Sequence, residues 1–141
     1  MADIMHTLTI EAKPAEIYEK IATKQGLSSW WTADTLFEPI LKSVAEFGFA
    51  NRAVVFKMRI DILDQDKRTQ WECVDGPVEW LYTKFFFDIE PKEDGHCYLH
   101  FKQTGWKEAN RLYAICNFDW AFYLLNLKDV IENPPDKDNG S

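Results

Sequence analysis

The sequence has few of the features by which common functional classes are recognised. It has no run of lysine and arginine, and its 16 basic residues are outnumbered by 23 acidic ones, which gives a net charge of −7. Nucleic acids and anionic membranes are bound by clustered basic residues, so we expect neither as a partner. No apolar run approaches the roughly 20 residues that span a membrane, and the N-terminus lacks the basic and apolar segments of a signal peptide.

Cysteine is also scarce, and the three present are Cys73, Cys97 and Cys116. Secreted disulfide-rich domains usually carry an even number of cysteines. An odd number, placed inside apparent strands and a helix, favours a reducing, cytoplasmic location. All three are expected to point inward with no evident activating group, so we interpret them as buried structural thiols.

The motifs of metal, nucleotide and hydrolase sites are missing as well. No Cys-x-x-Cys, His-Glu-x-x-His, Gly-x-Ser-x-Gly or glycine-rich phosphate loop occurs. His96 and His100 lie four residues apart on an expected strand, roughly 13 Å from each other, which is too far for both to bind one ion. We therefore expect no metal, no cofactor and no catalytic residue.

Aromatic residues, in contrast, are abundant. They make up 15% of the chain, with six tryptophans and ten phenylalanines. The surplus of large rings is explained either by a pocket or contact surface, or by a bulky core. A chain of 141 residues is long enough for one domain. We expect this domain to span 1–132, and the polar tail 133–141, which has nothing to bury, to be disordered.

The longest regular segment is expected at 107–132, which contains no glycine or proline. Its apolar residues recur at helical spacing, and polar residues such as Glu108, Arg111 and Asp129 occupy the opposite positions. We interpret the segment as one helix, roughly 39 Å long at about 1.5 Å per residue. Its apolar stripe needs a large apolar surface to pack against, and only the preceding strands provide one.

Before this helix, the pattern predicts one strand, two short helices and five further strands. Residues 4–12 alternate between apolar and polar, as a half-buried strand does. Pro14 suits a first helical turn, and Gly26 is expected to end that helix. A second short helix or a turn then covers 27–31, followed by a loop over 32–42. The remaining strands are expected at 43–50, 53–63, 68–74, 81–90 and 96–103.

Short turns join these five strands, and only antiparallel neighbours are joined in that way. Each strand is apolar on one face, so one side of the sheet needs a cover. The long helix is the only element large enough to provide it. The pattern therefore predicts an α+β fold, in which a curved antiparallel sheet wraps over the long C-terminal helix.

Three segments resemble one known family. Asp88–Trp106, DIEPKEDGHCYLHFKQTGW, is similar to the strand-turn-strand with a final Gly-aromatic pair found in the START-like (SRPBCC) superfamily, in the branch named for the activator of the heat shock protein 90 ATPase. Pro14–Trp31 resembles its opening helices, which end in a tryptophan pair. The long helix matches its pattern of Trp, two Leu, an aliphatic residue and Glu at Trp120, Leu124, Leu127, Ile131 and Glu132. The resemblance covers nearly the whole chain and implies the helix-grip fold, with a pocket under the long helix.

A cavity between sheet and helix is accordingly the candidate site. It has the apolar walls and few polar groups of small-ligand sites, although a filled core remains the alternative. The residues expected to line it are Trp30 and Trp31 at the mouth, Phe56, Met58, Trp71, Phe85, Phe87, Phe101 and Gln103 from the strands, and Trp120, Tyr123, Leu124 and Leu127 from the helix. Asp119, at the edge of the helical stripe, is either a pocket acid or a residue that is solvated or paired with Arg111.

Three functional hypotheses follow. The first is binding of a small hydrophobic molecule without catalysis, by a monomer or weak homodimer. The second, implied by the resemblance, is a module that binds a chaperone and acts in a stress response, with exposed residues such as Tyr82, Phe86 and Tyr98 forming the contact. The third is a cyclase- or hydrolase-like enzyme that uses the same cavity, for which only Asp119 and His6 offer an acid or base.

Overall fold

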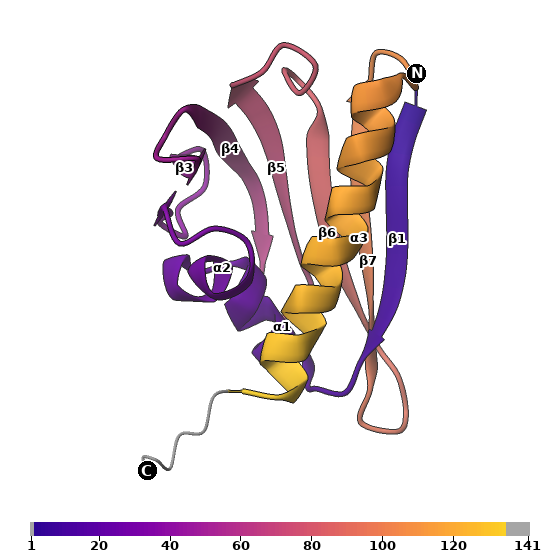
Figure 1. The fold of residues 1–141 in the computed structure, drawn as a ribbon. Helices are drawn as coiled ribbons and strands as arrows, with labels where there is room; N and C mark the ends of the chain where they lie inside the picture. The colour runs from indigo at the N-terminus through magenta and orange to yellow at the C-terminus, as the bar shows by residue number, and fades with distance from the viewer. Residues whose placement is uncertain (1, 135–141) are drawn as a thin grey trace.

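The computed structural model describes residues 2–134. Within them the chain forms one seven-stranded antiparallel sheet and three helices (Figure 1). The elements are β1 (Ala2–Ile10), α1 (Pro14–Ile21), α2 (Lys24–Trp30), β2 (Thr35–Leu36), β3 (Val44–Phe49), β4 (Val54–Asp64), β5 (Arg68–Asp75), β6 (Lys84–Pro91), β7 (Cys97–Trp106) and α3 (Arg111–Glu132). The predicted fold class is confirmed.

Strand order in the sheet is β1-β7-β6-β5-β4-β3-β2. The strands from β2 to β7 therefore pair in sequence order, as their short connections require. After β1 the chain passes through α1 and α2 to the opposite edge of the sheet, and β1 itself pairs with β7. Figure 1 shows α3 lying across one face of the curved sheet, with β1 along one edge and β3 near the other.

The core lies between this face of the sheet and α3. Side chains alternate along β6 and β7, so that Phe85, Phe87 and Phe101 are fully buried under the helix. From α3, Trp120 packs against Phe101 with ring centroids 4.3 Å apart. The predicted inward faces of these two strands are confirmed, and so is the burial of the three cysteines.

The two short helices differ from the prediction at their boundary. Gly26, expected to end the first helix, lies inside α2, and the Thr23 hydroxyl caps that helix by accepting a hydrogen bond from the Gly26 amide at 2.9 Å. Glycine is needed there because α2 packs closely on α1. A Cβ atom at position 26 would lie 2.5 Å from the Lys20 Cα atom.

Two other boundaries differ as well. The helix expected from residue 107 begins at Arg111, because the Asn110 side chain accepts a hydrogen bond from the Tyr113 amide at 3.0 Å and caps it. The loop expected over 32–42 contains β2, whose Thr35 and Leu36 pair with β3. Most of the tail predicted to be disordered, residues 135–141, lies outside the described residues.

Between residues 2 and 134, no helix has the length and apolar character needed to cross a membrane.

Candidate functional site

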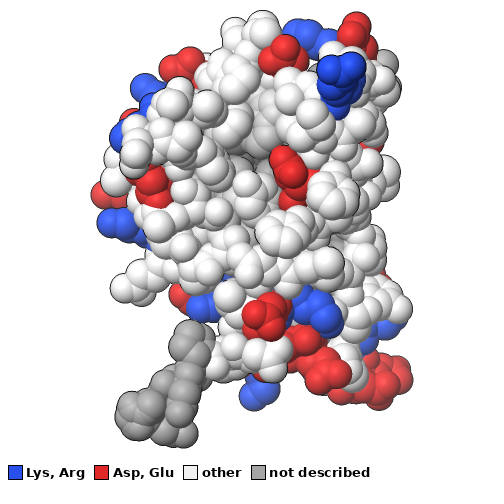
Figure 2. Space-filling view, in the orientation of Figure 1, with Lys and Arg blue, Asp and Glu red and all other residues white. Residues whose placement is uncertain are grey.

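An open cavity of about 260 Å³ lies between α3 and the β3–β4 side of the sheet. Figure 2 views the molecule from the side of α3, and the surface there is hollowed beside the helix. Its lining is mainly apolar and comes from segments far apart in sequence. The lining residues are Trp31, Phe49, Val54, Phe56, Pro77, Trp80, Leu112, Cys116, Asp119, Trp120 and Tyr123.

One wall is formed where β3 turns into β4. Ala50, Asn51 and Arg52 all have positive φ, with values of 53°, 55° and 68°. This tight reversal sets Phe49 opposite Val54 in the antiparallel register. The connection thereby presents apolar side chains of both strands to the cavity.

A second wall comes from the segment between β5 and β6. Trp80 stacks on Phe56, with ring centroids 4.0 Å apart, and lies 6.4 Å from Trp120. Thr83 donates a hydrogen bond to the Trp80 carbonyl at 2.7 Å, which holds this turn against the sheet. Trp80 therefore bridges the strand wall and the helix.

Of the tryptophan pair, only Trp31 lines the cavity. Its ring lies 4.4 Å from Phe47 and 5.2 Å from Trp120, and only 6% of the residue is exposed. Trp30 points into the core, where its indole N–H donates to the Lys20 carbonyl at 2.8 Å. The pair predicted at the mouth thus divides into one wall residue and one residue that fixes α2 to α1.

Polar groups reach the cavity from α3. Burial raises the pKa of the Tyr123 hydroxyl, and the charge of Asp119 adds to the shift. Burial likewise raises the pKa of the Cys116 thiol. Both groups are therefore protonated at neutral pH, and the thiol is a poor nucleophile.

Asp119 is exposed at the rim of the cavity. Among residues 2–134 it has no ion pair or side-chain hydrogen bond, so the predicted alternative of pairing with Arg111 is wrong, and the solvated alternative holds. His6, the other acid-base candidate, contacts the Asn117 carbonyl at 3.2 Å and does not line the cavity.

The structure brings four of the thirteen predicted lining residues to the cavity: Trp31, Phe56, Trp120 and Tyr123. The other nine pack in the adjoining core and do not line the cavity. They are Trp30, Met58, Trp71, Phe85, Phe87, Phe101, Gln103, Leu124 and Leu127. Gln103 has a structural role there, because it accepts a hydrogen bond from the Trp120 indole and donates one to Thr83, both at 3.1 Å.

Sequence reasoning missed Phe49, Val54, Pro77, Trp80, Leu112 and Cys116 as lining residues. Most of them flank turns or lie near the start of the helix, where alternation along a strand gives no signal. One signal was present: Trp80 lies three residues after Pro77, in the loop that follows the Gly76-Pro77 turn, and a large ring in a loop is typical of a residue that packs over a pocket or edge.

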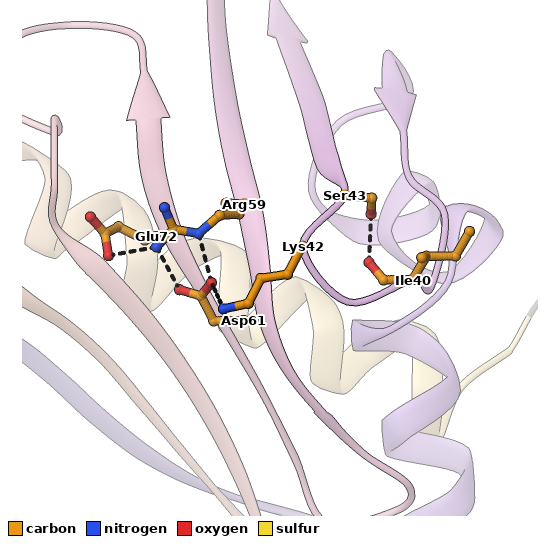
Figure 3. A network of polar contacts seen from close by, with 6 residues as sticks. All are labelled: Ile40, Lys42, Ser43, Arg59, Asp61 and Glu72. Carbon is orange, nitrogen blue, oxygen red and sulfur yellow. Dashed lines mark hydrogen bonds and ion pairs between the residues drawn. The ribbon is translucent and has the colours of Figure 1, made fainter.

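The opposite face of the sheet carries ion pairs (Figure 3). Arg59 donates to Asp61 at 2.8 Å and to Glu72 at 3.1 Å, while Lys42 contacts Asp61 at 3.3 Å. The hydrogen bond from Arg59 holds the pKa of Asp61 below its ordinary value. Since each carboxylate has a basic partner, we interpret this network as structural.

The remaining candidate groups lie apart from one another. His96 contacts Glu11 at 3.4 Å, and His100 contacts Glu90 at 2.8 Å. Within the described part of the chain, no three potential metal ligands gather at one point. Of the exposed residues proposed for a chaperone contact, Tyr82 is 68% exposed, while Phe86 and Tyr98 are each covered by a lysine ammonium, 4.9 Å and 4.7 Å from the ring centroids.

Comparison with known proteins gives the following relations. No family model matches the chain, and no curated protein matches it. Among solved structures, the Aha1 dimer from Colwellia psychrerythraea is 30% identical over 94% of this chain and 98% of that one, with a TM-score of 0.86. A protein from Mesorhizobium loti is 14% identical over 95% of this chain and 99% of that one, with a TM-score of 0.82, which shows a shared fold.

A third structure, DynU16, comes from the dynemicin biosynthetic locus. It is 12% identical over 93% of this chain and has a TM-score of 0.75, so it too shares the fold. The chain spans 47% of DynU16.

Proposed function

This chain belongs to the Aha1 family, the activator of heat shock protein 90 ATPase branch of the START-like superfamily, and from that premise we propose that it binds a small, mainly hydrophobic molecule in the cavity beside α3. The observation that supports this is the cavity itself. A helix that packed closely on the sheet along its whole length would leave no cavity. The N-terminal half of α3 is instead separated from β3 and β4, and aromatic side chains line the space between them.

The size of the cavity limits the ligand. A volume of about 260 Å³ lies just below the roughly 300–1,000 Å³ of pockets for drug-sized molecules. A ligand of one or two fused rings suits it, whereas a sterol or a long acyl chain does not. Burial of apolar surface at about 25 cal/mol per Å² would supply most of the affinity.

The polar groups indicate which ligand charge is favoured. Asp119 brings a carboxylate to the rim, while Tyr123 and Cys116 stay protonated. The whole chain carries a net charge of −7. An anionic ligand would be repelled at the rim, so we propose a neutral or cationic polar end.

The test uses 1-naphthol as a neutral two-ring probe, with binding followed by tryptophan fluorescence, because Trp31, Trp80 and Trp120 all line the cavity. Val54→Trp fills the cavity from β4, and Val44→Trp is the matched control, since Val44 is also a partly exposed valine at the start of a strand but lies outside the cavity. We expect Val54→Trp to weaken binding at least about tenfold and Val44→Trp to leave it unchanged. Equal affinities in all three proteins would contradict the proposal.

A second candidate function is regulation of a chaperone ATPase. It is supported by 30% identity to a protein named Aha1 over nearly the whole chain. For this function, the chaperone would contact an outer surface of the protein rather than the cavity. Pull-down of purified heat shock protein 90 with the wild-type chain and with Val54→Trp separates the two functions, because a surface contact is insensitive to cavity filling.

The Colwellia relative is a dimer. Neither ligand binding nor regulation of a chaperone requires self-association.

A further inference from the structure

Four large apolar side chains of α3 point away from the core. Ile115 is 49% exposed, Phe118 75%, Phe122 65% and Leu125 61%. They follow one another at intervals of three, four and three residues, which places them in one line along the helix. We call this line the outer stripe.

The fold itself makes no use of the outer stripe. The core-facing residues of α3 are Cys116, Trp120, Leu124 and Leu127, which are buried between helix and sheet. Figure 2 faces α3: over the middle of the helix the surface is uncharged apart from one acidic group, while charged residues are more numerous towards its two ends. Contiguous apolar patches of this kind are among the largest that a monomeric protein exposes, and they often mark contact surfaces.

We propose that the outer stripe is the interface of a symmetric homodimer, in which α3 packs antiparallel against α3 of a second copy. A two-fold axis between Phe118 and Phe122 makes the stripe complementary to itself. Phe118 then packs on the partner's Phe122, and Ile115 on the partner's Leu125. The alternation of three and four residues is the spacing at which side chains of two helices interlock.

The charges at the ends of the stripe determine the antiparallel direction. Arg111 and Asp129 continue the line by four residues at either end, and both are exposed. In the antiparallel arrangement Arg111 meets the partner's Asp129, and this contact occurs twice. A parallel arrangement would instead bring Arg111 against the partner's Arg111, and Asp129 against the partner's Asp129, which is repulsive.

The helix dipole supports the same direction. The first turn of α3 has no acidic residue and its last turn has no basic residue, so neither turn carries the charge that would compensate the helix dipole. Antiparallel pairing places the carboxylate of Asp129 near the positive end of the partner helix, and Arg111 near its negative end. Both contacts are favourable.

The small area of the outer stripe predicts a weak dimer. The exposed parts of the four stripe residues amount to roughly 500 Å² on each copy, because a phenylalanine offers about 150–250 Å². A standard interface buries about 800 Å² per partner. Asp119 borders the stripe near the two-fold axis, where it approaches the partner's Asp119 and further weakens the pairing. We therefore expect a dissociation constant in the micromolar range.

Sedimentation velocity of the full chain, from about 1 μM to about 1 mM, measures the dimer directly. We expect a concentration-dependent dimer whose dissociation constant rises at least about tenfold in Phe118→Ser and in Phe122→Ser, since each substitution removes two contacts. Ile40→Ser is the control, because Ile40 is 57% exposed but lies away from α3. A monomer across the whole range, or a dimer insensitive to both phenylalanine changes, overturns the proposal.

Charge exchange then tests the direction. Arg111→Glu alone sets two acidic residues against each other, and Asp129→Arg alone sets two basic residues against each other, so each variant should dimerise less than the wild-type chain. A mixture of the two should form a heterodimer, because both end contacts are again of opposite charge. If each variant alone dimerises like the wild-type chain, the antiparallel arrangement is wrong, because a parallel pair would also let the mixture associate.

Discussion

Asp119 is the residue whose charge should most directly influence ligand choice. It lies at the rim of the cavity without an ion-pair partner among the described residues. We predict that the wild-type chain binds 1-naphthylmethylammonium at least as tightly as 1-naphthol, and both more tightly than 1-naphthoate. In Asp119→Asn this preference should shrink by a few-fold, because the rim no longer carries a charge. Isothermal titration of the three probes measures it.

The control for this prediction is Asp129→Asn, which removes one carboxylate from the same helix but lies outside the cavity. It changes the net charge by the same amount. If both variants alter the preference equally, the overall charge of the protein is responsible, and Asp119 has no specific role at the rim.

Gly26 should respond to substitution in the direction opposite to helix propensity. Alanine in a helix interior is ordinarily more stable than glycine by about 1 kcal/mol. At position 26, however, a Cβ atom would lie 2.5 Å from the Lys20 Cα atom, so α1 and α2 would have to move apart. We predict that Gly26→Ala destabilises the protein by roughly 1–3 kcal/mol, as overpacking does.

Urea unfolding measures this difference. Gln25→Ala is the matched control, because residue 25 is exposed on the same helix, and we expect its free energy of unfolding to change by less than about 0.5 kcal/mol. A Gly26→Ala variant as stable as the wild-type chain would mean that α1 and α2 do not pack too closely to admit a Cβ atom at position 26.

Cys73 should make stability depend on alkaline pH. Burial raises its pKa from 9.0 to about 11 in the folded protein. Between these values the unfolded chain has lost the proton and the folded chain has kept it, so the free energy of unfolding falls as pH rises. This contribution to the free energy of unfolding is complete below pH 9, is lost by about pH 11, and amounts to roughly 3 kcal/mol.

Urea unfolding at pH 8 and pH 10.5 tests this, with Cys73→Ala as the comparison. The variant lacks the thiol but keeps the tyrosines and other cysteines, which titrate in the same range. The wild-type chain should lose more stability than the variant over this interval. Equal losses of stability in the wild-type chain and in Cys73→Ala would show that the Cys73 thiol does not contribute to the pH dependence.

The sequence largely predicted which residues are buried, but it did not predict which residues line the cavity. Alternation along β6 and β7 correctly placed Phe85, Phe87 and Phe101 inside. Alternation reports which face of a strand a residue occupies, but a cavity depends on how far two elements stand apart. The helix covers those three residues closely and stands away from Phe49 and Val54, and no local pattern records that separation.

At the scale of elements, the helix and sheet are joined by one buried polar chain. The Trp120 indole donates to Gln103, and Gln103 donates to the Thr83 hydroxyl. We predict that Gln103→Leu, which is similar in size, destabilises the protein by about 1–3 kcal/mol, because it leaves the indole N–H buried without an acceptor. Thermal and urea unfolding measure the loss.

A double-mutant cycle with Trp120→Phe isolates the hydrogen bond. Phenylalanine has no N–H group to leave unpaired, so Gln103→Leu should cost less in that background than in the wild-type chain. Equal costs in both backgrounds would show that packing at position 103, rather than the hydrogen bond, accounts for the loss.

Element boundaries show where sequence patterns reach their limit. The end of α3 at Glu132 was predicted, but its start was placed four residues early, because 107–109 are good helix residues, whereas the helix begins only after Asn110, which caps it. β2 was missed because two residues are too few to show alternation. It exists through pairing with β3. Long elements can thus be predicted from the periodicity of their own residues, whereas short elements form through contacts with neighbouring elements in the fold.

At the scale of the whole molecule, the antiparallel topology was predictable from short turns alone, since it needs no knowledge of side-chain contacts. Packing between the layers is less local. Trp31, which follows α2, contacts Phe47 of β3, Trp71 of β5 and Trp120 of α3, with centroid distances of 4.4, 6.1 and 5.2 Å. One ring therefore joins both layers of the fold.

We predict from this packing that the chain unfolds as one cooperative unit, consistent with a single domain over 1–132. Far-UV circular dichroism reports the helices and strands, and fluorescence reports the tryptophans between them. If the layers cannot separate without exposing Trp31 and Trp120, the two signals should give coincident thermal and urea transitions. A fluorescence change that precedes the loss of secondary structure would instead mean that α2 and α3 detach from the sheet before it unfolds, and that the cavity opens as a separate step.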